Sequence, residues 1–140
     1  MKGHYYSQHA GPLRAELGAA IPRDLMRDLH RKEPVRHFVV AVRQFAILAV
    51  ATWALIRFEH PLIWIPIAIV QGFTVFNFTV LLHEVVHRTV LTQQREGINR
   101  LLGILYAVPS GISSTQFTRW HLDHHAGLGS YEEDPKRVVR

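Results

Sequence analysis

Two long apolar segments separated by three residues are the strongest constraint on how this chain can fold. The first runs from Phe38 to Phe58 and the second from Leu62 to Leu82. Each reaches the roughly 20 residues that a helix needs to cross a bilayer. The turn between them, Glu59-His60-Pro61, is so short that the two helices must run antiparallel. We therefore predict an all-α membrane fold built on a transmembrane helical hairpin.

A soluble helical core is the alternative to this hairpin. A helix at the surface of a soluble protein needs a polar face, whereas the second segment carries no charge. Its only polar side chains are those of Gln71, Thr74, Asn77 and Thr79. We expect Gln71, Thr74 and Asn77 to hydrogen-bond to a neighbouring helix, with the lining of a substrate path as the alternative. The composition of the segment thus favours the membrane.

Charge is concentrated outside the hairpin. Residues 1–36 and residues 83–140 each contain seven of the 16 Lys and Arg residues, and the net charge is +5. A nucleic-acid partner would require a basic stripe on a folded face, whereas basic residues beside apolar segments fit a membrane surface. We therefore predict no nucleic-acid partner. Because both outer ends of the hairpin carry the basic excess, we predict that both termini are cytoplasmic.

Composition narrows the protein class further. Hydrophobic residues make up 48% of the chain, which excludes an intrinsically disordered protein. The sequence contains no cysteine, which excludes a disulfide framework, a cysteine-based zinc finger and an iron–sulfur cluster held by thiolates. Together with the compact N-terminal segment, this favours the bacterial inner membrane over the endoplasmic reticulum.

The remaining segments define the domain organisation. Residues 1–36 form a polar N-terminal cytosolic segment, which we expect to be partly irregular because glycine and proline punctuate it. Within it, residues 23–30 predict a short amphipathic helix. Residues 98–112 are a third apolar stretch, too short to span a bilayer, so an interfacial or re-entrant helix is expected. Residues 37–140 are then one domain, in which a cytosolic helical cap follows the hairpin.

Five of the ten histidines fall into two tight groups, one at the end of the second apolar segment and one further on. His83 and His87 are spaced i, i+4, so on a continuing helix both lie on one face. His121, His124 and His125 are spaced i, i+3, i+4 and share a face in the same way. Imidazole is a good ligand for Zn, Cu, Fe and Ni. The two groups therefore predict a nitrogen-rich metal site.

Each group alone permits other interpretations. His83, Glu84 and His87 also fit the helix of a membrane zinc metalloprotease, with Glu84 as the general base. That interpretation leaves the second histidine group without a role. Glu84 and His87 form half of the motif of soluble di-iron bundles, whose second half is missing here. The plainest alternative is two histidine-rich helix ends that bind only water and carboxylates.

The two groups together resemble the membrane fatty-acid desaturase and hydroxylase superfamily. H-x-x-x-H at the end of a hydrophobic hairpin is followed 34 residues later by H-x-x-H-H, which Trp120 precedes and Tyr131-Glu132-Glu133-Asp134-Pro135 follows. The resemblance covers about residues 35–137. It implies that two non-haem iron ions bind on the cytosolic side. Their ligands in this chain would be His83, His87, His121, His124 and His125.

The same resemblance implies roles for the neighbouring carboxylates. Asp123 and Asp134 would orient imidazole N–H groups, a task that carboxylates often perform beside metal ligands. Glu84 would either hydrogen-bond to a metal ligand or be an unliganded neighbour of the metal. No catalytic residue beyond the metal ligands is implied.

By this resemblance the chain is an oxidoreductase that uses O₂ to desaturate a fatty-acyl chain. Its partners would be the lipid substrate, the membrane and an external electron donor of the ferredoxin or cytochrome b5 kind. Hydroxylation or ketolation of an alkyl or carotenoid lipid is the alternative within the same chemistry. Members of the superfamily also carry a second hairpin and a third H-x-x-H-H group, whereas this chain ends at Arg140. We therefore expect a partial desaturase-like domain, a fragment or natural truncation that holds one iron ion better than two.

Overall fold

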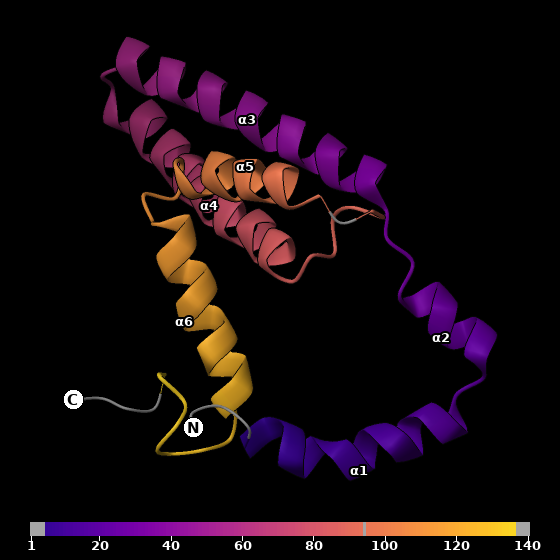
Figure 1. Cartoon of the computed structure of the whole chain (residues 1–140). Helices are drawn as coiled ribbons and strands as arrows, with labels where there is room; N and C mark the ends of the chain where they lie inside the picture. Colours follow the sequence, from indigo (N-terminus) through magenta and orange to yellow (C-terminus); the bar gives the residue numbers. More distant parts are fainter. Residues whose placement is uncertain (1–4, 94, 137–140) are drawn as a thin grey trace. The chain divides into compact units, whose positions relative to one another are not determined.

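All the regular elements in the part of the chain that the structure describes, residues 5–93 and 95–136, are α-helices (Figure 1). The structure is a computed structural model. The helices are α1 (Tyr5–Ala20), α2 (Arg23–Leu29), α3 (Pro34–Arg57), α4 (Pro61–Val86), α5 (Glu96–Ala107) and α6 (Ser114–Gly127). They belong to two compact units, one formed by residues 32–114 and the other by the segments before and after them. The predicted all-α class is confirmed.

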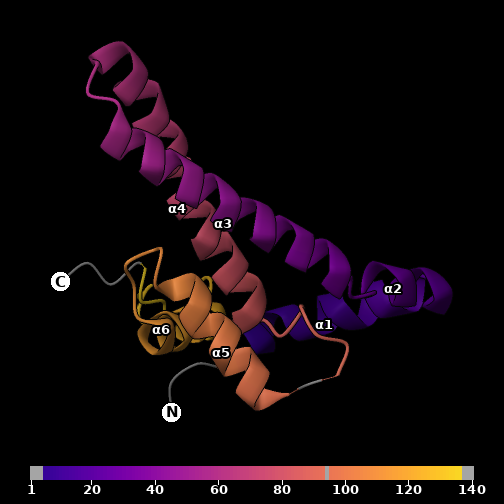
Figure 2. The same cartoon turned by 90° about the horizontal axis from the view of Figure 1, so that it is seen from above.

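The helices α3 and α4 form an antiparallel hairpin that the two views in Figures 1 and 2 show side by side. Their 24 and 26 residues correspond to about 36 and 39 Å of helix. A bilayer core is about 30 Å thick, so both are long enough to cross it. Only 22% of the most apolar window of each candidate span is buried, whereas the core helix of a soluble protein would be mostly buried. The two predicted membrane spans are thus present as helices.

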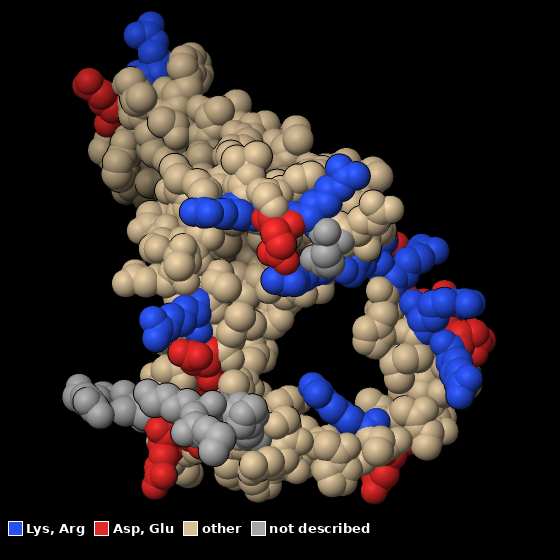
Figure 3. Space-filling model, viewed as in Figure 1, with Lys and Arg blue, Asp and Glu red and all other residues tan. Residues whose placement is uncertain are grey.

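The exposed surface of the hairpin is apolar, as a surface in contact with lipid must be. Figure 3 shows an uncharged surface along the hairpin, with charged side chains gathered toward its ends. Large apolar side chains are exposed along both helices, among them Val39, Val42, Val50, Trp53, Ile56, Leu62, Ile65, Phe73 and Phe76. An exposed apolar surface of this extent is costly in water and favourable in hydrocarbon.

Prolines mark the beginning of both spans. Pro34 and Pro61 lie in the first turn of α3 and α4, where proline is favoured because its missing N–H would have no helical partner. As a result α3 begins before the predicted Phe38. At its other end α4 continues to Val86, beyond the apolar segment, so His83 lies within the helix.

Three helices meet in the core of this unit. The buried face of α3 repeats at helical spacing and consists of small or polar residues: His37, Ala41, Gln44, Ala51 and Ala54. Small residues let helix backbones approach closely. Phe45 packs on Phe78 of α4 with ring centroids 4.6 Å apart, and Tyr106 of α5 lies within 6.5 Å of both rings. This aromatic cluster joins α3, α4 and α5.

Three of the polar side chains of the second span, Gln71, Thr74 and Thr79, form hydrogen bonds. Gln71 donates to the hydroxyl of Thr52 on α3 at 3.2 Å, which confirms the expected bond between helices for this residue. Thr74 instead donates to a backbone carbonyl one turn earlier in its own helix, at 2.8 Å. Thr79 donates to the hydroxyl of Ser110 at 3.3 Å, beyond the end of α5.

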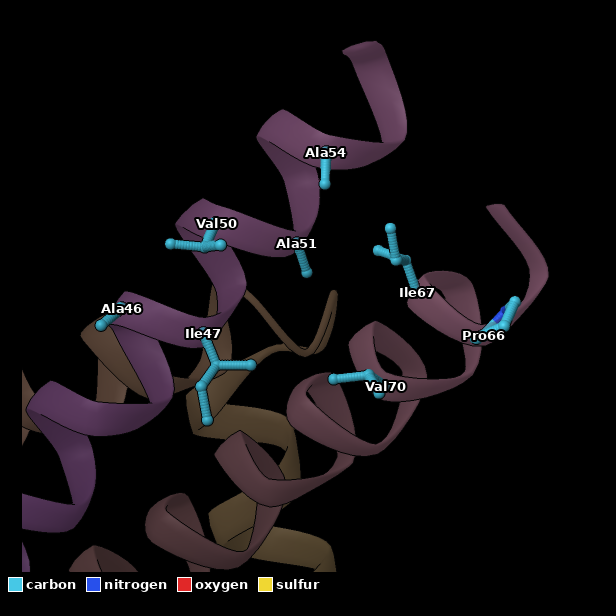
Figure 4. Close-up of a pocket in the computed structure, with 8 residues that line it drawn as sticks. All are labelled: Ala46, Ile47, Val50, Ala51, Ala54, Pro66, Ile67 and Val70. Carbon is cyan, nitrogen blue, oxygen red and sulfur yellow. The ribbon is translucent and has the colours of Figure 1, made fainter. Parts of the chain in front are cut away.

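The α3–α4 interface opens near the hairpin turn into an apolar groove of about 500 Å³. Figure 4 shows Ala51 on α3, and Ile67 and Val70 on α4, directed into the space between the helices. The other lining residues are Ala46, Ile47, Val50, Ala54 and Pro66. Ile67 lies about 24 Å along the helix from His83, at about 1.5 Å per residue. The groove is therefore separate from the histidines.

The third apolar stretch forms α5, whose twelve residues correspond to about 18 Å. This length confirms that it is too short to span a bilayer. One face is buried by Leu102, Gly103, Tyr106 and Ala107, while Leu101, Ile104, Leu105 and Val108 are exposed. The helix ends before Pro109, and Gly111 turns the chain at a φ of 65°.

The N-terminal segment is more regular than the sequence analysis expected. The helix α1 runs through Pro12, although an interior proline removes a helical hydrogen bond. Strong helix formers follow it in Leu13-Arg14-Ala15-Glu16-Leu17, and their propensity opposes the effect of the proline and glycines. The helix α2 confirms the short helix predicted within residues 23–30. Neither α1 nor α2 has a buried residue among those described.

Candidate metal centre

The first histidine pair lies on one face at the end of α4. His87 is the C-terminal cap residue, and its N–H donates to the carbonyl of His83 at 3.1 Å. The two imidazole centroids are 4.5 Å apart, and both side chains are half-buried. The helix therefore does continue through His83, and the i, i+4 spacing places the two rings together as predicted.

Several hydrogen bonds hold the segment that follows this pair, residues 88–91. Arg88 adopts a φ of 56°, a left-handed conformation that is uncommon outside glycine. The ammonium group of Lys32 donates to the carbonyls of Arg88 at 2.7 Å and Leu91 at 3.0 Å. Thr89 donates through its N–H and its hydroxyl to the carbonyl of Glu84, at 3.1 and 2.9 Å. A cation at a helix C-terminus is favourable because of the negative end of the helix dipole.

Glu84, between the two histidines in sequence, bonds to a residue that the sequence analysis did not select. His37 of α3 donates from Nδ1 to Oε2 of Glu84 at 2.6 Å. Its Nε2 accepts from the hydroxyl of Tyr106 at 3.0 Å. His37 and Tyr106 are buried, whereas the Glu84 side chain is 46% exposed. The partners are 47 and 69 positions from His37 in the sequence, so no local motif signals this contact.

The protonation state of Tyr106 fits this arrangement. Burial, and secondly the negative charge of Glu84, raise the pKa of Tyr106 to about 12. The phenol is therefore protonated at neutral pH and can donate to His37. Both ring nitrogens of His37 are thus hydrogen-bonded, Nδ1 to Glu84 and Nε2 to Tyr106.

The second histidine group lies on α6 and repeats the geometry of the first. The Nε2 atoms of His121 and His125 are 2.9 Å apart, and the ring centroids are 4.5 Å apart. Two imidazole nitrogens that bind one ion at about 2.1 Å and at a right angle are about 3 Å apart. Phe117 stacks on the ring of His121 at 5.4 Å, and His121 is buried. The pair is thus held at a spacing that suits metal ligation.

His124 is oriented by a buried carboxylate. Its Nδ1 donates to Oδ1 of Asp134 at 2.7 Å, and Trp120 stacks on the ring. The same oxygen accepts the N–H of Lys136 at 2.9 Å, and Asp134 is 2% exposed. A carboxylate on one imidazole nitrogen directs the other nitrogen toward a metal. Asp123, the other carboxylate selected from the sequence, is exposed on α6.

A glycine allows the chain to return to His124. A Cβ atom at Gly127 would lie 2.7 Å from the carbonyl carbon of Glu133 and 2.9 Å from the nitrogen of Asp134. Such contacts are too close for any other residue type at this position. The hydroxyl of Ser130 accepts the N–H groups of Glu132 and Glu133, both at 3.2 Å, and so shapes the turn. The end of α6 is therefore built to place Asp134.

The other described histidines have local roles. His9 and His30 each bond through Nδ1 to a carbonyl of their own helix at 2.8 Å. His60 caps the start of α4 by accepting the N–H of Leu62 at 3.3 Å. The candidate ligands are then five imidazoles, a donor set that fits iron as well as zinc, copper or nickel.

Comparisons with known proteins point to one family. A family model described as "Fatty acid desaturase" matches residues 59–139, which include both histidine groups. The chain is also 36% identical over 55 residues to sphingolipid delta(4)-desaturase DES1 of Bos taurus. That alignment covers 39% of this chain and 17% of the relative, so the chain spans only a small part of the relative's length. No solved structure matches.

Proposed function

We propose that this chain, which belongs to the fatty acid desaturase family, supplies ligands to a non-haem iron centre for the O₂-dependent desaturation of a fatty-acyl chain. Membership of this family supports a desaturase-type membrane protein of the oxidoreductase class. The observation that carries the finer proposal is the pair of matching i, i+4 imidazole pairs, with ring centroids 4.5 Å apart in each.

The five imidazoles have separate tasks in this proposal. His83 and His87 bind metal from the end of α4, and His121, His124 and His125 bind metal from α6. When bound by these residues, iron would supply the O₂ activation that breaking unactivated C–H bonds of a lipid requires. Asp134 bonds to Nδ1 of His124 and so directs its Nε2 toward a metal. Two iron ions are the expected complement of the site, of which the five imidazoles of this chain would hold one better than two.

The reaction defines the partners. Desaturation converts –CH₂–CH₂– into –CH=CH–, and the two hydrogen atoms leave as water. One O₂ is reduced to two H₂O with the two substrate hydrogens, two further electrons and two protons. The electrons require an external donor of the ferredoxin or cytochrome b5 kind. The substrate is a lipid acyl chain, which the bilayer beside the apolar hairpin can supply.

A direct experiment tests this proposal. Membranes containing the chain are given an electron donor, O₂ and an acyl lipid deuterated along its chain. We expect a product that has lost two deuterium atoms and gained a double bond, detected by mass spectrometry. A product that retains its chain length and gains oxygen would instead support the hydroxylase or ketolase alternative.

The role of Glu84 distinguishes the proposed desaturase from a zinc metalloprotease. A protease base must face the metal-bound water, whereas the Glu84 carboxylate is hydrogen-bonded to His37 at 2.6 Å. We expect Glu84→Gln to retain at least half of the iron content, because an amide oxygen still accepts from His37. Elemental analysis of the purified protein measures this. If the wild type cleaves a peptide library and the variant does not, the protease is correct and the desaturase is not.

The proposed topology places both termini in the cytoplasm, with the bacterial inner membrane as the expected location. Because the sequence has no cysteine, single-cysteine variants report exposure directly. We expect Glu59→Cys, in the hairpin turn, to react with an impermeant maleimide on intact cells. Gln8→Cys, in α1, should react only after permeabilisation. The opposite pattern would reverse the proposed orientation.

A further inference from the structure

The contact between His37 and Glu84 has a consequence for the neighbouring histidine pair. We propose that His37 is a positioning residue, which fixes the rotation of the end of α4 and thereby the directions of His83 and His87. The inference rests on the proposed function, because it takes this pair to be metal ligands. It assigns a role to a histidine that lies outside both histidine groups.

The hydrogen bonds define one orientation of three helices. His37 lies on α3, Glu84 on α4 and Tyr106 on α5, and the two bonds are 2.6 and 3.0 Å long. His37 and Tyr106 are 6% and 1% exposed, so water does not compete freely for their bond, and both ring nitrogens of His37 depend on protein partners although the Glu84 carboxylate is half-exposed. A buried polar group that loses its partner is costly, and hence this arrangement resists displacement.

Because α4 is a regular helix, the direction of Glu84 fixes the directions of His83 and His87. Residues follow one another at about 100° around a helix. Glu84 is directed at α3. Measured around the axis of α4 from the direction of Glu84, His83 and His87 lie at about 100° and 60°, both toward the same side. A rotation of about 10° would move an atom at the outer radius of the helix, about 6 Å, by about 1 Å. Ligand distances in a metal site are held to within about 0.2 Å.

Other contacts also restrain this end of α4: Lys32 and Thr89 donate to backbone carbonyls, and Arg88 pairs with Glu96 at 2.9 Å. Its neighbouring buried residues are Leu81, Leu82 and Val85, whose apolar contacts have little directionality. The amide of Asn99 donates to the backbone carbonyl of Val85 at 3.1 Å, which restrains the position of the helix axis. The bond of Glu84 to His37 is the charged, directional contact of its side chain.

The test measures cobalt binding to the full chain in detergent, by the absorption of the Co²⁺ site, beside the thermal midpoint of unfolding. For His37→Ala we expect an affinity roughly tenfold weaker, similar to the loss of other groups that orient ligands. His37→Asn, which keeps an amide donor near Nδ1, should recover part of the affinity. Phe45→Leu is the matched control, because it loosens the packing of α3 on Phe78 without touching Glu84.

The outcomes separate positioning from general stability. If His37→Ala and Phe45→Leu weaken cobalt binding equally at equal loss of stability, the inference is wrong. If the wild type binds no cobalt, the proposed function fails, and the ring ¹⁵N shifts of His83 and His87 decide the positioning role. We expect these shifts to change in His37→Ala and not in Phe45→Leu. Unchanged shifts would overturn the inference.

Discussion

Replacing His121, His124 and His125 together by alanine is expected to remove bound iron from the detergent-purified chain. The variant loses three of the five imidazoles, and the remaining pair offers two nitrogens, fewer than a stable site requires. We expect iron to fall to the background level of elemental analysis. The helix should persist, since alanine has the highest helix propensity.

A matched triple variant controls for the number of histidines removed. His9, His30 and His60 lie outside both groups and bond to the local backbone. Their replacement by alanine should leave the iron content unchanged. Iron retained by the first variant would contradict the proposed ligands. Zinc retained by it would show that His83 and His87 bind metal alone and would favour the metalloprotease.

Replacing Asp134 by alanine is expected to weaken iron binding by about 10- to 100-fold, the usual effect of removing a carboxylate that orients a ligand. The side chain of Asp134 is 3% exposed, and that of its partner His124 is 12% exposed. Without the carboxylate, the Nδ1–H of His124 loses its acceptor, at a cost of about 1–3 kcal/mol. Titration of the purified protein with Fe²⁺ under argon measures the affinity.

Two further variants show what the carboxylate contributes. Asp134→Asn keeps an oxygen acceptor for His124 but not the charge, so we expect an intermediate affinity. Asp123→Ala removes a carboxylate from the exposed face of α6 and should change the affinity less than twofold. Equal losses in Asp134→Ala and Asp123→Ala would mean that general charge, and not the bond to His124, governs binding.

Local patterns were sufficient for much of the fold. The hairpin, α2 and α5 follow from apolar length and spacing, which are properties of short segments. The helix α3 begins earlier, and α4 ends later, than the predicted apolar segments. Hydropathy does not detect a helix that begins at a proline or continues through polar residues. The helix α1 was missed because glycine and proline were weighted above the helix formers between them.

Some residues of the candidate site could likewise be predicted from local spacing, and others could not. The five histidines were identified from their i, i+3 and i+4 spacing, since helical periodicity places such residues on one face. The bond of Asp134 to His124 could be anticipated only as a carboxylate nearby, and the alternative choice, Asp123, is exposed on α6. His37 carries no signal in its own segment, because both of its partners come from other helices.

The sequence alone was enough to predict the all-α class, the two apolar helices and the candidate metal ligands. These depend on apolar length and helical period, which act within about 25 residues of chain. The packing of the helices was needed to show that His37 is bonded to Glu84 and to Tyr106, and that Gly127 lets Asp134 reach His124. Those contacts depend on how distant segments pack, because a directional bond forms only when packing brings donor and acceptor within about 3 Å.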